Sequence, residues 1–180
     1  MKRRLFIAIN LPGKTKKRLI DYKEKWNQLD SIKWVNKNNL HVTLLFIGYV
    51  DDDEMYKICQ IVKETAKKHE SFTINFERII LGPPNKTPRM FWLQGNESQE
   101  LANLQGDLQE RIEQRHGKRY LFRPHVTLAR FTSKALESLS KELNEPFVAQ
   151  ISVETIEVMQ SNLKRSGAEY SVLESIELGL

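Results

Sequence analysis

The tetrapeptide His-Val-Thr-Leu occurs twice in the chain, at residues 41–44 and again at residues 125–128. In an extended strand, residues i and i+2 point to the same face about 7 Å apart, so each imidazole stands beside a threonine hydroxyl. With four histidines and eight threonines in the chain, two His-x-Thr matches occur by accident in about one such sequence in a hundred, before the matching Val and Leu are counted. The pair therefore predicts two half-sites that face one substrate.

Two histidines on different strands suit an in-line displacement at phosphorus, in which one takes a proton from the attacking oxygen and the other gives one to the leaving oxygen. An ordinary imidazole pKa near 6.5 makes both protonation states available near neutral pH. The hydroxyls of Thr43 and Thr127 can donate hydrogen bonds to the non-bridging phosphate oxygens. His41, Thr43, His125 and Thr127 are therefore the candidate site residues.

Alternatives to this chemistry remain open. A histidine followed by alternating apolar residues is also typical of a structural strand, and two histidines can hold a metal, although no carboxylate stands beside either motif. The sequence contains no G-x-x-x-x-G-K-[ST] loop, no H-E-x-x-H pattern and no G-x-S-x-G turn. The other two histidines, His69 and His116, lie in polar sequence typical of helix ends, where the helix dipole gives them a structural role.

Length and composition indicate an ordinary globular domain, so residues 1–180 are expected to form a single two-lobed domain. The formal charge of +5 favours polyanionic partners such as nucleic acid. The single cysteine, Cys59, excludes an intrachain disulfide and a cysteine-based zinc cluster, and it suits a reducing compartment. The acids from Asp51 to Glu54 are expected to cap a helix, with a metal site as the less favoured alternative.

No apolar run approaches the length of about 18 residues that a membrane span requires. The basic N-terminus and the run from Leu5 to Ile9 superficially resemble a signal peptide, but Asn10 and Pro12 interrupt the pattern. We therefore expect a cytoplasmic protein with no membrane association.

The hydrophobic periodicity predicts an α+β fold with antiparallel strands and an approximate internal duplication. Strands are expected over residues 5–11, 41–49, 71–81, 90–93, 125–131, 147–159 and 169–178, and helices over residues 14–29, 54–68, 97–114 and 134–143. On the first motif strand, strict alternation places Val42, Leu44 and Phe46 toward the helices, opposite His41 and Thr43.

Three further residues have two interpretations each. Arg130 points away from His125 by strict alternation, unless a bulge or a strand end redirects it. For Arg130 and for Arg123 a phosphate contact and a structural salt bridge are equally favoured. Phe6 is either a core residue, which its apolar strand favours, or a base-stacking surface at the site.

The doubled motif resembles the 2H phosphoesterase superfamily, in particular its bacterial and archaeal RNA 2′,3′-cyclic phosphodiesterases, which are also called 2′-5′ RNA ligases. The resemblance spans nearly the whole chain. Besides the two motifs it rests on Arg4-Leu5-Phe6-Ile7-Ala8-Ile9, Trp34-Val35, Gly48, Pro124, Ala129-Arg130, Ser161-Asn162-Leu163 and Gly167-Ala168-Glu169-Tyr170.

The resemblance implies two pseudo-symmetric lobes of antiparallel sheet, with helices outside and one motif from each lobe at a central cleft. It also implies that a terminal RNA 2′,3′-cyclic phosphate is opened to a 2′-phosphomonoester without a metal or other cofactor. In that reaction His41 is the proton donor and His125 the proton acceptor. Lys33 and the turn from Pro83 to Pro88 are positions where substrate choice can differ.

The expected partners are RNA with 2′,3′-cyclic phosphate ends or small cyclic nucleotides, with no obligate protein partner evident. Ligation of RNA halves is one alternative activity, because it uses the same side chains as hydrolysis. A protein that grips RNA termini without turnover is another, although intact histidines and threonines at all four positions favour an enzyme.

Overall fold

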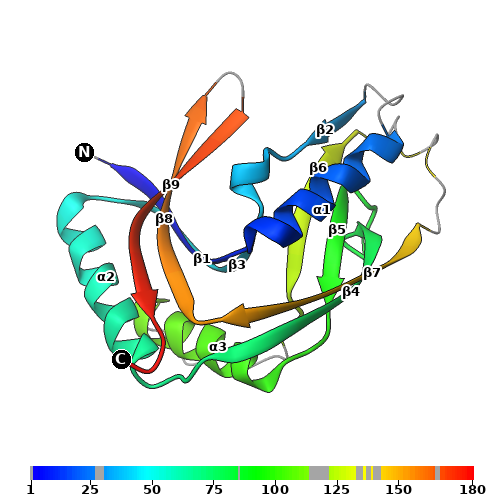
Figure 1. The fold of residues 1–180 in the computed structure, drawn as a ribbon. Coiled ribbons are helices and arrows are strands. Elements are labelled where there is room, and N and C mark those ends of the chain that lie inside the picture. The colour runs from blue at the N-terminus through cyan, green and yellow to red at the C-terminus, as the bar shows by residue number, and fades with distance from the viewer. Residues whose placement is uncertain are drawn as a thin grey trace.

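The computed structural model describes residues 2–26, 31–84, 86–113, 122–132, 136, 139, 143–164 and 167–180. These residues form one antiparallel sheet of nine strands with three α-helices. Figure 1 shows how these elements are arranged. The strands are β1 (Arg3–Asn10), β2 (Ile32–Trp34), β3 (His41–Val50), β4 (Phe72–Gly82), β5 (Met90–Gly95), β6 (His125–Phe131), β7 (Asn144–Val153), β8 (Thr155–Lys164) and β9 (Gly167–Glu177). The helices are α1 (Gly13–Lys23), α2 (Asp52–Ala66) and α3 (Gln99–Glu113), with short 3-10 helices η1 (Glu24–Trp26) and η2 (Lys37–Asn39).

The predicted α+β class is confirmed, and most predicted elements are observed close to their expected ends. The strand expected over residues 147–159 is wrong, because β7 and β8 are separate strands that meet at Glu154. Pro146 does not end a helix but lies in β7, opposite Arg78 of β4. A proline is tolerated there because β7 lies at the end of the described strand order, where one side of its backbone needs no partner. The helix expected over residues 134–143 falls largely outside the described residues.

Two half-sheets, of four and five strands, meet between the motif strands. From this junction outward the order is β3, β1, β8, β9 on one side and β6, β5, β4, β7 on the other, and β2 adds to β6. β3 and β6 are joined in register at one pair, Val42 opposite Val126. Each half-sheet therefore contributes one copy of the motif, as the sequence duplication predicts.

The hydrophobic core lies between one face of the sheet and the helices. Fully buried side chains from both halves share one cluster, including Ile7, Val42, Val126, Val62 of α2 and Leu104 of α3. The acids at the start of α2 act as predicted: Asp51 accepts from the Glu54 amide while the Glu54 carboxylate accepts from the Asp51 amide, a capping box. None of the described helices is long and apolar enough to cross a membrane.

A β-bulge follows the threonine of the first motif. Ala8 of β1 pairs with Thr43, whereas Ile7 pairs with Leu45, so Leu44 is the extra residue. The bulge shifts the alternation of β3 by one residue beyond this point. The expectation that Phe46 faces the helices is therefore wrong: Phe46 is 68% exposed, and its ring lies 6.2 Å from that of Phe6 on the other face.

Candidate active site

The four motif side chains gather on the face of the sheet opposite the helices. Val42 and Val126 are buried on the helix side, so their neighbours in sequence point the other way. Because β3 and β6 are antiparallel with Val42 opposite Val126, His41 stands across from Thr127, and Thr43 stands across from His125. The structure thus brings all four predicted residues together at the junction of the two half-sheets.

Each imidazole is oriented by a backbone carbonyl two residues earlier in the chain. His41 Nδ1 lies 2.6 Å from Asn39 O, and His125 Nδ1 lies 3.5 Å from Arg123 O. Since a carbonyl oxygen can only accept, each Nδ1 carries the hydrogen, and the Nε2 atom of a neutral ring is left as the acceptor. Thr43 Oγ1 lies 3.0 Å from His41 Nε2 and donates to it while the ring is neutral.

Aromatic rings from neighbouring strands enclose both histidines. The ring centroid of His41 is 5.0 Å from that of Phe6 on β1 and 5.3 Å from that of Tyr170 on β9. His125 is stacked on Trp92 of β5, with centroids 4.0 Å apart and an interplanar angle of 27°. Each imidazole is therefore fixed on two sides, by its Nδ1 hydrogen bond and by an aromatic face.

Burial lowers the pKa of both histidines below the ordinary value of 6.5. For His41 the positive charges of Lys16 and His125 also lower the pKa, and the Asn39 carbonyl partly opposes them. For His125 the Arg123 carbonyl opposes the effect of burial. An anion placed between the two rings would raise both pKa values, because it favours the charged imidazolium.

A second bulge, in β6, redirects Arg130. Thr127 pairs with Trp92 and Ala129 pairs with Phe91, so Leu128 is the extra residue, at the same motif position as Leu44 in β3. Arg130 consequently pairs with Met90 on the face that carries Trp92, and its Nη1 lies 3.2 Å from Met90 Sδ. The guanidinium is exposed on the site face, which favours a phosphate contact over a structural salt bridge.

Arg123 and Phe6 have mainly structural contacts. The Arg123 guanidinium forms an ion pair with Glu97 at 2.9 Å, and its carbonyl orients His125. Phe6 is 3% exposed and packs with Ala8, Met159 and Tyr170 in a small cluster beside His41. This burial favours the core interpretation of Phe6 over a base-stacking surface.

Of the remaining histidines, His69 lies away from the site. His69 Nε2 lies 2.9 Å from Asp107 Oδ2, so His69 connects the end of α2 to α3. His116 lies outside the described residues. Within the described ranges, no group of three or more His, Cys, Asp or Glu side chains is arranged to hold a metal ion.

Four residues of the site could not be identified from the sequence. Lys16 of α1 is buried and lowers the pKa of His41 through its charge. Asn39 supplies the carbonyl for His41, and its side-chain amide donates to Ala168 O at 2.7 Å, which ties η2 to β9. Trp92 and Tyr170 pack on the histidines. Tyr170 lies in a matching segment of the resemblance, but no spacing rule connects any of the four to the motifs.

Comparison with known proteins shows relatives over nearly the full length. A family model described as the 2′-5′ RNA ligase superfamily matches residues 18–165. An RNA 2′,3′-cyclic phosphodiesterase of Thermotoga maritima is 27% identical over 175 residues, which cover 94% of this chain and 92% of the relative. Another, from Aeropyrum pernix, is 30% identical over 154 residues, covering 81% of this chain and 86% of the relative.

Solved structures share the fold. A crystal structure from Thermus thermophilus superposes with a TM-score of 0.82 at 26% sequence identity and covers 98% of both chains. E. coli LigT in complex with 3′-AMP superposes with a TM-score of 0.82 at 22% identity, over 100% of both chains. The arrangement of strands and helices is therefore that of these proteins.

Proposed function

The chain belongs to the 2′-5′ RNA ligase superfamily, and from this premise we propose that it is an RNA 2′,3′-cyclic phosphodiesterase that works by two-histidine acid–base catalysis without a metal. The observation that carries the proposal is the pair of imidazoles on adjacent strands. Each has its Nδ1 hydrogen committed to a backbone carbonyl, so each can present Nε2 to a phosphate between them.

In the proposed reaction water attacks the phosphorus of the cyclic phosphate while His125 accepts its proton. The bond from phosphorus to O3′ breaks, and His41 donates a proton to O3′, which leaves a 2′-phosphomonoester and a free 3′-hydroxyl. Thr43, Thr127 and Arg130 donate to the non-bridging oxygens, where negative charge grows in the transition state.

The surroundings of the two rings support this assignment of roles. Burial and the positive charges of Lys16 and His125 lower the pKa of His41, which makes its imidazolium a stronger acid than an ordinary one and suits a proton donor. The indole face of Trp92 lies against His125, and an aromatic face attracts the imidazolium that forms when His125 accepts a proton. The lowering of the pKa by Lys16 is given for His41 alone, and the nearly parallel stack on an indole is given for His125 alone.

The roles of the two histidines also determine on which side of the phosphate the rest of the substrate lies. If His41 protonates O3′, the ribose and base of the terminal nucleotide lie on the His41 side, over β3, β1 and β9. Phe46 and Tyr170 offer aromatic surface there, and Phe46 is the more exposed of the two. We assign base stacking to these rings, in place of the buried Phe6.

The test is incubation with an oligoribonucleotide that ends in a 2′,3′-cyclic phosphate, in the presence of EDTA. The expected result is undiminished hydrolysis with the phosphate on the 2′-oxygen, determined by NMR or by 2′-specific and 3′-specific phosphatases. Activity that disappears on chelation and returns with zinc or manganese would contradict the metal-independent mechanism, and a 3′-phosphate product would contradict the assigned bond cleavage.

A further inference from the structure

A row of exposed aromatic side chains continues from the first catalytic motif along β3. Phe46 is 68% exposed and Tyr49 is 64% exposed, although β3 lies in the middle of the sheet. Phe46 pairs with Phe6 and Tyr49 pairs with Arg4, and alternation places Phe6 and Arg4 on the same face of β1. Because the ring of Phe6 packs beside His41, both exposed rings lie on the site face.

The spacing of the two rings suits two different bases. Phe6 and Arg4 are two residues apart in β1, so the step between them is about 7 Å. Their partners Phe46 and Tyr49 are separated by the same step. That distance is about the outer limit for contact between two aromatic rings. A base that rests on Phe46 therefore leaves Tyr49 for a neighbouring base.

The substrate can continue from the site in one covalent direction. A 2′,3′-cyclic phosphate ends an RNA chain, so the rest of the chain is attached through O5′ of the terminal ribose. The beginning of β3 is closed by η2, because the side chain of Asn39 donates to Ala168 O of β9 at 2.7 Å and Tyr170 packs on His41. The row toward Tyr49 continues the same face in the opposite direction, away from this closed end.

A cation stands beside the outer ring. Arg4 is exposed, and among the residues that the structure describes its guanidinium has no hydrogen-bonding or ion-pair partner. Its neighbour Arg3 points to the other face, where it pairs with Asp52 at 2.8 Å. The acidic start of α2 is thus matched by Arg3 and by its own capping box. The Arg4 guanidinium is therefore able to bind a phosphate.

The exposed side chains of this face are contiguous. Single exposed apolar residues are common on protein surfaces, but here Val172 of β9 is exposed as well, and it pairs with Met159, which pairs with Phe6. A wholly apolar surface of this kind would suit a protein partner. Aromatic rings that lead out of the catalytic site with a cation beside them suit a single nucleic-acid strand instead.

We propose that Arg4 and Tyr49 bind the nucleotide that precedes the terminal one, so that the preferred substrate is an RNA chain of at least two nucleotides. The inference rests on the proposed function, because it takes the terminal ribose to lie on the His41 side. The preceding base stacks on Tyr49, and Arg4 donates to the phosphate that joins the two nucleotides. Neither contact involves a reacting atom, so the two residues select the substrate and leave the proton transfers to the motifs.

The experiment compares a 2′,3′-cyclic mononucleotide with a dinucleotide that ends in the same cyclic phosphate. The unmodified protein should have a KM for the dinucleotide at least about fivefold lower, the smallest effect of one base–aromatic stack. Tyr49→Ala should remove this difference, while its KM for the mononucleotide and its kcat on both substrates stay within about twofold. Tyr56→Ala, which removes a comparably exposed tyrosine from α2, is the matched control and should preserve the difference.

Two further measurements separate the two contacts. On a dinucleotide whose first nucleotide has no base, Tyr49→Ala should have no effect, whereas Arg4→Gln should still raise the KM. For the complete dinucleotide, Arg4→Gln should also lower the slope of log KM against log salt by about 0.7, the contribution of one phosphate contact in a single strand. Lys57→Gln on α2, which removes another exposed cation, should leave that slope unchanged.

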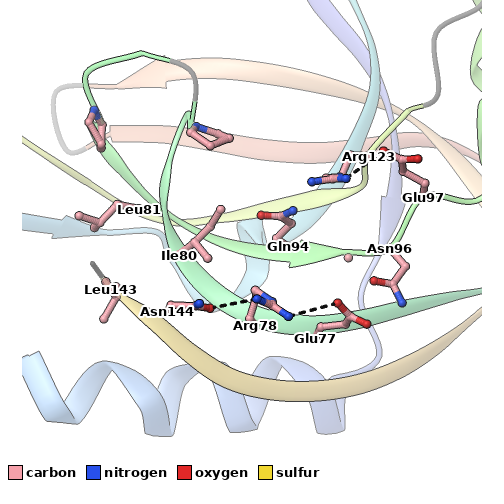
Figure 2. Close-up of a pocket in the computed structure, with 13 residues that line it drawn as sticks. Glu77, Arg78, Ile80, Leu81, Gln94, Asn96, Glu97, Arg123, Leu143 and Asn144 are labelled. Atoms are coloured by element: carbon pink, nitrogen blue, oxygen red, sulfur yellow. Dashed lines mark hydrogen bonds and ion pairs between the residues drawn. The ribbon is translucent and has the colours of Figure 1, made fainter. Parts of the chain in front are cut away.

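Each other outcome has a definite meaning. Equal KM values of the unmodified protein for the two substrates overturn the inference and leave the proposed function intact. A Tyr49→Ala variant that keeps the full difference also overturns it, as does an equal loss on both substrates. A raised dinucleotide KM in Arg78→Ala, with none in Tyr49→Ala, would place the preceding nucleotide in the pocket of Figure 2, which Arg78 lines. Absence of hydrolysis of both substrates by the unmodified protein means that the proposed function itself fails.

Discussion

At the scale of single residues, the two histidines of the site are oriented in the same way but lie in different surroundings. Both rings donate from Nδ1 to the carbonyl two residues earlier and rest on an aromatic ring from the adjacent strand. The positive charge of Lys16 additionally lowers the pKa of His41. Orientation therefore explains how both rings reach one phosphate, and the difference in surroundings explains how they divide the proton transfers.

Removal of either imidazole should abolish most of the activity. We expect His41→Ala and His125→Ala each to lower kcat on a cyclic-phosphate substrate at least about a hundredfold, because general acid–base groups contribute on that scale. Thr43→Ala and Thr127→Ala should cost less. His69→Ala is the control, since His69 contacts Asp107 away from the site. A comparable loss in the His69 variant would show that the wrong histidines have been assigned.

The dependence of activity on pH follows from the two lowered pKa values. The free enzyme needs His125 neutral and His41 protonated, so kcat/KM should fall on both sides of a maximum that lies below pH 6.5, the ordinary histidine value. The profile of kcat should shift to higher pH, because the bound phosphate anion raises both pKa values. Steady-state kinetics on a cyclic mononucleotide checks both profiles. A kcat/KM that rises steadily through neutral pH would contradict the acid role of His41.

At the scale of elements, the bulges decide which side chains reach the site. The period-two alternation places His41, Thr43, His125 and Thr127 correctly, because all four precede a bulge. Beyond Leu44 and Leu128 the alternation shifts by one residue, which brings Phe46 and Arg130 onto the site face. Nothing in the tetrapeptide distinguishes a bulged strand from a regular one, so sequence could name Arg130 as a candidate but could not orient it.

The β4–β5 pairing should transmit a change at Gly82 to His125. A Cβ atom on Gly82 would lie 2.3 Å from Trp92 Cδ2, so Gly82→Ala must displace the indole that stacks on His125. We expect the free energy of unfolding to fall by about 1–3 kcal/mol, as for other overpacked sites, and kcat to fall with it.

Gly13→Ala is the matched control, because a Cβ atom there meets nothing within 4 Å and alanine favours α1. Thermal unfolding and kinetics of the two variants separate the effects. Full activity in Gly82→Ala would mean that the stack does not position His125.

At the scale of the whole molecule, the internal duplication is the feature that the sequence predicts best. The doubled motif predicts two half-sites that face one substrate, and the family resemblance implies one motif from each lobe. In the strand order the two motif strands are neighbours at the junction of the two halves of the sheet. A pocket lined by Gln94, Arg78 and Arg123, among other residues, lies near His125 (Figure 2), and it could not be predicted in the same way. It is formed by residues from β4, β5, β7 and the segments around Pro84 and Arg123, which are distant in sequence and share no recognisable spacing.

The overall charge of +5 predicts how salt acts on binding. We expect the KM of a longer cyclic-phosphate RNA to rise more steeply between about 50 and 200 mM salt than that of a cyclic mononucleotide, because more phosphate contacts release more counterions. Kinetics across a salt series tests this expectation. Equal slopes for the two substrates would show that only the terminal phosphate is held by charge.

The central claim is that the leaving oxygen lies on the His41 side of the phosphate and the attacking oxygen on the His125 side, because the proton transfers and the position of the aromatic surface both depend on it. A phosphodiester analogue with p-nitrophenolate as the leaving group needs little protonation, and it must first be shown to be a substrate of the unmodified enzyme. On this analogue His41→Ala should lose much less activity than on the cyclic phosphate, whereas His125→Ala should stay poor on both. Rescue of His125→Ala in place of His41→Ala would reverse the two sides, and equal losses on both substrates for both variants would show that the histidines hold the phosphate and transfer no proton.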